Sequence, residues 1–102
     1  MSRENTYQVE ALSLTRKTVP ATAGGTTLET MGVVINPQAH RISLQAVGGN
    51  VYVSDVEGNA DANSFVLFEN GSITLDVAIN AAKRLKFLSN GATMNILQQG
   101  DI

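Results

Sequence analysis

Apolar and polar residues alternate along several short stretches of the chain. Between Arg41 and Ala46, for example, Ile42, Leu44 and Ala46 occupy every second position, which places them on one face of an extended strand. The alternation predicts seven or eight strands, over residues 7–15, 28–35, 41–46, 51–53, 65–69, 72–77 and 84–88, with a last strand around Met94 and Ile96. The inward positions of the C-terminal strands predict a core of Ile73, Leu75, Leu85, Phe87, Met94 and Ile96.

Three short glycine-containing pairs separate these strands. Asn70-Gly71 and Asn90-Gly91 each lie between alternating segments, and Gly48-Gly49 lies between two more. A two-residue hairpin of type I′ needs positive φ at both central residues, which glycine adopts freely and asparagine adopts more easily than most residues. The pairs therefore predict antiparallel hairpins.

The N-terminal part of the pattern is less regular. In Tyr7–Thr15 the alternation slips midway, so that Leu12 and Leu14 fall on the face opposite Tyr7 and Ala11, and a slip of this kind indicates a β-bulge or a change of surface. Residues 16–27 are small and polar, which predicts a loop or an arm. Asn36-Pro37 predicts a turn. We expect a crossover loop over residues 79–83 and a polar tail over residues 98–102.

Short strands at regular spacing without a long helix favour a β-sandwich or barrel. We expect an all-β fold, an antiparallel, jelly-roll-like β-sandwich of about seven to eight short strands with an N-terminal arm. With 102 residues it is one domain overall, in which residues 1–27 form an N-terminal strand and arm or loop and 28–102 form the sandwich core.

Composition and charge exclude several classes of function. The chain has no cysteine, a net charge of −2 and scattered basic residues, so it carries neither a thiolate site nor the positive surface that nucleic acid requires. Its apolar runs are too short to span a bilayer, and its N-terminus lacks the apolar segment of a signal peptide. We expect a soluble protein with no direct nucleic-acid or membrane partner.

Candidate catalytic and metal sites are weak. His40 is the single histidine, follows a turn and has no identifiable set of partners, so we interpret it as an exposed or edge residue. Oxygen-bearing side chains occupy every second position from Asp55 to Asn63, but glycine and glutamate are absent where a calcium-binding EF-hand loop requires them. We expect a solvated loop there, no metal or other cofactor, and no enzymatic activity.

A second set of apolar residues falls on the strand faces opposite the core. Either a second core layer or a neighbouring subunit can cover such residues, and an exposed set of this size is typical of an interface. The candidate interface residues are Leu12, Leu14, Tyr52, Val66, Phe68, Leu88 and Leu97. Together with the predicted loop and arm, they indicate a protein that binds its neighbours.

Three groups of residues in the C-terminal part form a recognisable pattern: Arg41, Leu44, Gln45, Val51 and Val53, then Leu67, Gly71, Leu75 and Asp76, then Leu85, Phe87, Gly91 and Leu97. Through this pattern, about 60 residues resemble small all-β virion structural proteins of tailed bacteriophages. The resemblance implies a structural component of the particle that is located in the virion after assembly in the host cytoplasm. It implies no catalytic residues.

The expected function is therefore that of a capsid decoration or cement protein that stabilises a phage shell through subunit contacts. Its expected partners are other virion proteins, either the major capsid protein or neck and tail proteins, and further copies of itself in a homo-oligomer. Two alternatives stay open. One is a structural protein of the neck or tail, and the other is a carbohydrate- or receptor-binding β-sandwich of a fibre or adhesin.

Overall fold

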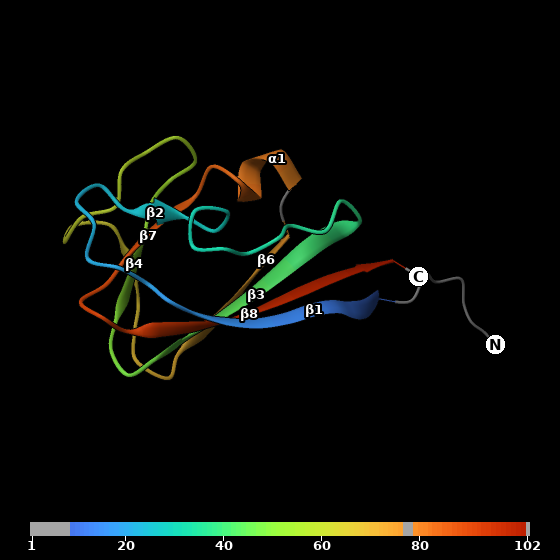
Figure 1. The fold of residues 1–102 in the computed structure, drawn as a ribbon, viewed down its shortest axis with the longest axis horizontal. Helices are drawn as coiled ribbons and strands as arrows, with labels where there is room; N and C mark the ends of the chain where they lie inside the picture. The colour runs from blue at the N-terminus through green and yellow to red at the C-terminus, as the bar shows by residue number, and fades with distance from the viewer. Residues whose placement is uncertain (1–8, 77–78, 102) are drawn as a thin grey trace.

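A computed structural model of the chain describes residues 9–76 and 79–101, which form two antiparallel sheets (Figure 1). The first sheet contains, in spatial order, β1 (Val9–Thr18), β8 (Thr93–Asp101), β3 (Ala39–Val47) and β6 (Ser72–Asp76). The second contains β2 (Thr26–Thr27), β7 (Lys86–Leu88), β4 (Val51–Val53) and β5 (Phe65–Leu67). A single turn of helix, α1 (Ile79–Ala82), precedes β7.

Successive strands change sheets almost every time. Only β4 and β5 follow each other within one sheet, whereas every other connection crosses from one sheet to the other. Two four-stranded sheets connected in this way form a jelly roll. The structure thus confirms the expected all-β, jelly-roll-like sandwich and the expected number of strands.

The hairpin prediction was wrong at all three glycine pairs. Gly48-Gly49 connects β3 to β4, Asn70-Gly71 connects β5 to β6, and Asn90-Gly91 connects β7 to β8, and in each case the two strands belong to different sheets. The pairs reverse the chain, as predicted, but they form corners of the sandwich. A turn signal specifies a reversal of direction and carries no information on which strand becomes the hydrogen-bonding partner.

The corner at Asn70 shows how its geometry differs from a type I′ hairpin. Asn70 has a φ of 66°, while Gly71 has no positive φ, and the Gly71 N–H donates to the carbonyl of Phe68 at 2.8 Å. A turn with positive φ at its third residue alone is typical of type II. The Asn70 N–H then donates to the Ala46 carbonyl at 2.8 Å, which aligns the start of β6 with β3.

The core lies between the sheets and follows the predicted alternation on the central strands. Ile42, Leu44 and Ala46 of β3 are buried, as are Leu85, Phe87, Met94 and Ile96. Ile73 and Leu75 differ from the prediction, because they point inward but are only partly buried. β6 is the edge strand of its sheet, and an edge position leaves one side of each inward side chain uncovered.

Residues 28–35 form no strand, in contrast to the prediction. The segment coils through close backbone hydrogen bonds, including Val33 N–H to the Leu28 carbonyl at 3.0 Å. Leu28, Val33 and Ile35 are nevertheless buried in the core cluster. The alternation of apolar residues over 28–35 therefore predicted correctly that these side chains are buried, but its prediction of a β-strand was wrong. The turn predicted at Asn36-Pro37 is confirmed, since the Ala39 N–H donates to the Asn36 carbonyl at 3.0 Å.

The irregularity predicted in the first strand is confirmed as a β-bulge. The register of β1 against β8 shifts between Ala11 and Ser13, which leaves Leu12 as the extra residue. The strand then continues to Thr18, and β2 occupies Thr26–Thr27, so the loop predicted for residues 16–27 is confined to its middle part. β1 and β2 thereby supply one edge strand to each sheet, and the predicted arm before residue 9 lies outside the described residues.

Two further expectations need correction near the end of the chain. The predicted polar tail is the second half of β8, in which the side chain of Gln98 is fully buried. Its amide donates to the Val34 carbonyl at 2.9 Å and accepts from the Asn36 N–H at 2.8 Å. The predicted crossover loop includes α1, whose last residue, Ala82, is fully buried, so packing on the core supports a helical turn that is too short to form alone.

Candidate interaction surfaces

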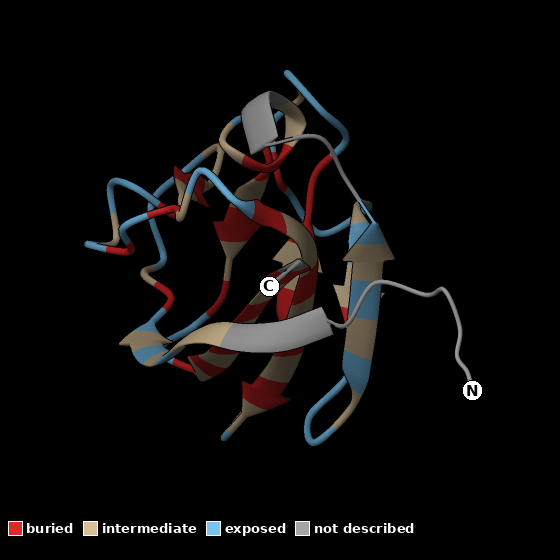
Figure 2. Cartoon of the chain, turned by 90° about the vertical axis from the view of Figure 1, so that its right-hand side faces the viewer, coloured by how far each residue is buried: buried red, intermediate tan, exposed pale blue. Residues whose placement is uncertain are grey.

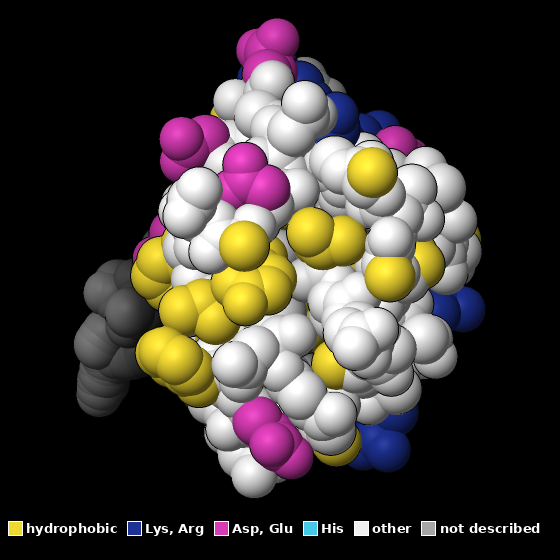
Figure 3. All heavy atoms as spheres, turned by 90° about the vertical axis from the view of Figure 1, so that its left-hand side faces the viewer, with side chains coloured by type: hydrophobic (Ala, Val, Ile, Leu, Met, Phe, Trp, Pro, Cys, Tyr) yellow, Lys and Arg dark blue, Asp and Glu magenta, His cyan; other side chains and the backbone are white. Residues whose placement is uncertain are grey.

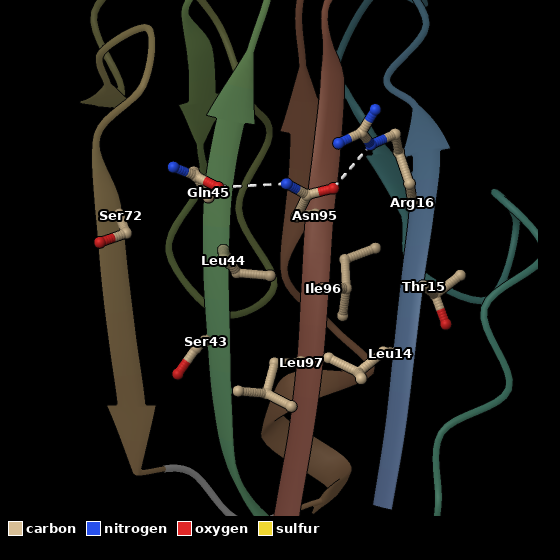
Figure 4. A pocket seen from close by; sticks show the side chains of 10 residues that line it. All are labelled: Leu14, Thr15, Arg16, Ser43, Leu44, Gln45, Ser72, Asn95, Ile96 and Leu97. Atoms are coloured by element: carbon tan, nitrogen blue, oxygen red, sulfur yellow. Dashed lines mark hydrogen bonds between the residues drawn. The ribbon is translucent and has the colours of Figure 1, made fainter. Parts of the chain in front are cut away.

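The outer face of the first sheet carries a pair of leucines. Leu14 of β1 lies directly opposite Leu97 of β8, and Leu97 in turn lies opposite Ser43 of β3. Figure 4 shows the Leu14 side chain extending toward β8 and the Leu97 side chain on the β3 side of the β8 ribbon. Leu14 is 78% exposed, whereas Leu97 is partly buried, so the pair presents apolar surface with no described segment covering it.

A row of hydrogen-bonded polar side chains runs beside the leucine pair. Arg16 Nε donates to Asn95 Oδ1 at 2.7 Å, and Asn95 Nδ2 donates to Gln45 Oε1 at 3.1 Å (Figure 4). These residues occupy one register row across β1, β8 and β3. Their mutual bonds hold planar amide and guanidinium groups in fixed positions on the sheet surface.

The leucines and the polar row together line an open groove of about 560 Å³. We call it the sheet-one groove. It is lined by Leu14, Thr15, Arg16, Ser43, Leu44, Gln45, Ser72, Asn95, Ile96 and Leu97. A groove that combines an apolar pair with fixed hydrogen-bonding groups suits a protein surface of mixed polarity, because both kinds of contact are satisfied side by side.

The outer face of the second sheet carries the other predicted cluster. Tyr52 of β4 lies opposite both Val66 of β5 and Leu88 of β7, and all three side chains are partly buried. Phe68 follows β5 two positions after Val66 and is 65% exposed. We call these four residues the sheet-two patch. The view onto this end of the molecule shows apolar side chains gathered there, with acidic side chains at the margin (Figure 3).

The bulge separates Leu12 from both clusters. A Cβ added to Gly100 would lie 2.8 Å from Leu12 Cδ1, so the Leu12 side chain is directed toward Gly100. Leu12 is partly buried in this position. The structure therefore assembles the other predicted residues into two clusters on opposite sheets and leaves Leu12 beside the end of β8.

Sequence reasoning missed two strongly exposed apolar residues. Val34 is 84% exposed in the coil before Asn36, and Phe65 is 59% exposed at the start of β5. Phe65 lines a second opening, of about 230 Å³, with Ile73, Leu75 and Leu85 among other residues. The available signal was that Phe65 directly follows the polar loop over residues 54–64, but this position does not specify that β5 becomes an edge strand.

The candidate chemical sites are not assembled into a reactive centre. His40 lies in β3 at a register shift between Ala39 and Arg41 and is partly buried. In the loop after β4, Glu57 is paired with Arg84 at 2.7 Å, and Asp61 accepts from the Asn63 N–H at 2.8 Å. Within residues 9–76 and 79–101, no group of three His, Cys, Asp or Glu residues is placed to hold a metal ion.

No helix among the described residues has the length and apolar character needed to cross a membrane. We compared the chain with protein-family models, with curated proteins and with solved structures, and none of them matches it.

Proposed function

We propose that this protein is a structural component of a bacteriophage particle that stabilises a shell by binding its neighbours through both outer sheet faces. The observation that carries the proposal is the position of the two apolar clusters. The sheet-one groove and the sheet-two patch lie on the outer faces of different sheets, so one molecule can contact two neighbours at once. This arrangement suits a protein that cements a shell by bridging its neighbours.

The energetics favour burial of both clusters. Complete burial of a leucine or phenylalanine side chain contributes roughly 1.5–3 kcal/mol, before the costs of association are subtracted. Leu14 and Phe68 each retain most of their surface in the isolated chain. In a shell, many identical contacts of this kind add together, so modest affinity at each contact is sufficient.

The jelly-roll architecture and the sequence resemblance support the same proposal by analogy. Jelly rolls form the domains of many viral capsid proteins, although lectins and cupins share the architecture. The resemblance to tailed-phage virion proteins supports the capsid class in this proposal. A place in the head, as a decoration or cement protein, remains the leading form of the proposal, with neck and tail positions as its variants.

The decisive experiment asks whether the protein is present in particles. Virus-like particles are purified on a density gradient from cultures of the organism that carries the gene, and an antibody raised against the recombinant chain is used on the fractions. The proposal expects the chain in the particle peak at many copies per particle, and immunogold labelling then separates heads from tails. Particles that lack the chain would overturn the proposal.

One observation favours a carbohydrate-binding module as the second candidate. The hydrogen-bonded row of Arg16, Asn95 and Gln45 offers fixed polar groups beside apolar surface, as sugar-binding sites do. No aromatic side chain lines the sheet-one groove, however, so stacking on a sugar ring is missing there. Binding to a glycan array that is lost in an Asn95→Ala variant, combined with absence from particles, would favour this candidate.

A further inference from the structure

We propose that β6 is a dimerisation edge, along which the strand pairs antiparallel with β6 of a second copy of the chain. The proposal concerns the edge of the first sheet that pairs with no other described strand. Of the residues in the sheet-one groove and the sheet-two patch, Ser72 alone belongs to β6. It does not depend on a role in a phage particle. A two-fold contact of this kind would join two first sheets into one continuous sheet.

β6 differs from the other edge strands of the sandwich. Exposed sheet edges tend to pair with other chains, and proteins protect them with bulges, charged residues or very short strands. β1 contains the bulge at Leu12 and the charged residues Arg16 and Lys17, while β2 has two residues and β5 has three. β6 has five residues, no bulge against β3 and no proline or lysine, and its one charged residue, Asp76, lies at its end and is paired with Arg41. Figure 2 shows this strand at the side of the molecule without a buried residue.

The backbone groups of β6 that point away from β3 can be identified from the hydrogen bonds at its start. The Ala46 N–H donates to the Gly71 carbonyl at 3.1 Å, and the Ala46 carbonyl accepts from Asn70 at 2.8 Å. Bonded pairs recur at every second residue of an antiparallel ladder, so Leu44 with Ile73 and Ile42 with Leu75 are the next ones. The N–H and C=O groups of Ser72, Thr74 and Asp76 therefore point outward.

The outward N–H and C=O groups of β6 are complementary to the same groups of a second β6 related by a two-fold axis. In an antiparallel pair centred on Thr74, each Thr74 exchanges both hydrogen bonds with the other Thr74, and each Ser72 does so with Asp76 of the second copy. Hydroxyl groups oppose each other at the axis, and each carboxylate opposes a hydroxyl. Like charges are thus kept apart, and Asp76 retains its ion pair with Arg41, which measures 2.8 Å.

The same register covers apolar surface that the isolated chain leaves open. Ile73 of one copy lies opposite Leu75 of the other on the inner face of the joined sheet. Both side chains are only partly buried in the isolated chain, and both line the opening beside the exposed Phe65. The half-covered ends of two cores would therefore meet at the dimer axis.

A cross-linking experiment tests the register directly. The chain contains no cysteine, so a Thr74→Cys variant of the full chain has a single thiol, which the proposed axis places next to the same thiol of the second copy. We expect a short bis-maleimide to convert most of this variant into covalent dimer at micromolar concentration. The matched control is Ser43→Cys, one strand inward on the same face, which should remain monomeric under the linker.

Solution mass tests the contact without a linker. Sedimentation equilibrium of the unmodified chain should give twice the chain mass, and Thr74→Pro should lower the dimer affinity by at least 100-fold. Proline is tolerated at this position because the Thr74 N–H takes no part in pairing with β3. Circular dichroism confirms folding, and Thr74→Lys, which places two ammonium groups at the axis, provides a second variant with the same expectation.

Mixing two variants of opposite charge should restore dimer formation. Thr74→Lys and Thr74→Asp should each be monomeric alone and should form a heterodimer when mixed, because opposite charges then meet at the axis. A monomeric unmodified chain at millimolar concentration would overturn the proposal, and so would folded Thr74 variants that still dimerise. Either result leaves the presence of the chain in particles, tested separately above, unaffected.

Discussion

The side chain of Gln98 accepts a hydrogen bond from the backbone N–H of Asn36 at 2.8 Å, across 62 residues of sequence. With its second bond, to the Val34 carbonyl, the fully buried amide attaches the coil over residues 33–36 to the middle of the first sheet. An amide in the core is stable only when both its donor and its acceptor are satisfied. Gln98 therefore specifies the position of the coil as well as filling core volume.

Replacing Gln98 should consequently be costly. Gln98→Ala leaves the Asn36 N–H and the Val34 carbonyl without their partner and opens a cavity, so we expect a loss of about 2–4 kcal/mol in the free energy of unfolding. Urea denaturation followed by circular dichroism measures the change. Gln99→Ala, on the opposite face of the same strand, is the control and should cost less than about 0.5 kcal/mol. Equal effects at the two positions would contradict this account of the buried amide.

Gly100 is required for a steric reason. A Cβ at this position would lie 2.2 Å from the Gln38 carbonyl oxygen, and the backbone at Gln38 must shift to admit it. We expect Gly100→Ala to destabilise the protein by about 1–3 kcal/mol, as overpacking does. Thermal unfolding monitored by circular dichroism gives the value.

Gly48 provides the contrast to Gly100. It has a φ of 79°, and a Cβ added there would meet no other atom within 4 Å, so Gly48→Ala should cost only the conformational penalty, about 1–2 kcal/mol. The two substitutions should also respond differently to a second change. Shortening Leu12 to alanine should recover part of the loss caused by Gly100→Ala and none of the loss caused by Gly48→Ala. An absence of coupling between Leu12 and Gly100 would argue against their contact.

The hydroxyl of Ser89 holds the corner between β7 and β8. Its Oγ donates to the Val19 carbonyl at 2.5 Å and accepts from the Ala92 N–H at 3.0 Å, and the side chain is buried. Ser89→Ala should destabilise the fold by about 1–3 kcal/mol, because two buried backbone groups lose their partner. Chemical denaturation is again the measurement, and Thr22→Ala, at an exposed position, should change stability little. A stability unchanged by Ser89→Ala would show that water replaces the hydroxyl.

The proposed function predicts that substitutions in the two apolar clusters weaken binding to particles without lowering the stability of the isolated chain. Leu14→Ser and Phe68→Ser remove mostly exposed apolar surface, so each should leave the melting temperature of the isolated chain within about 2 °C of its original value. In particles, each variant should reduce the number of copies bound by severalfold, measured by quantitative immunoblot. Full occupancy with both variants would remove these two clusters from the assembly contact.

Much of the fold could be predicted because alternation reports which face of a strand is buried. The pattern was sufficient for the inward residues of β3, the bulge at Leu12 and the grouping of Tyr52, Val66 and Leu88 on an outer face. Period-two alternation is a local property of each strand. The alternation identifies the buried face whichever strand becomes the hydrogen-bonding neighbour. These predictions were therefore correct even though the hairpin partners were assigned wrongly.

The remaining features depend on tertiary context. The pattern around Asn70-Gly71 is the same for a hairpin and for a corner between two sheets, and only the global topology distinguishes them. Gln98 is polar and near the C-terminus, so its burial was not evident until the coil at Val34 and Asn36 supplied its partners. The partial exposure of Ile73 and Leu75 likewise follows from the edge position of β6.

The pairing of the first described strand with the last has a consequence for how the chain folds. Val9 is in register with Asp101, so the β1–β8 ladder cannot begin until nearly the whole chain is available. Contacts between residues so distant in sequence require a large entropic cost of loop closure before any stabilisation is gained. We therefore expect folding on the scale of milliseconds to seconds, and completion only after β8 has emerged from the ribosome.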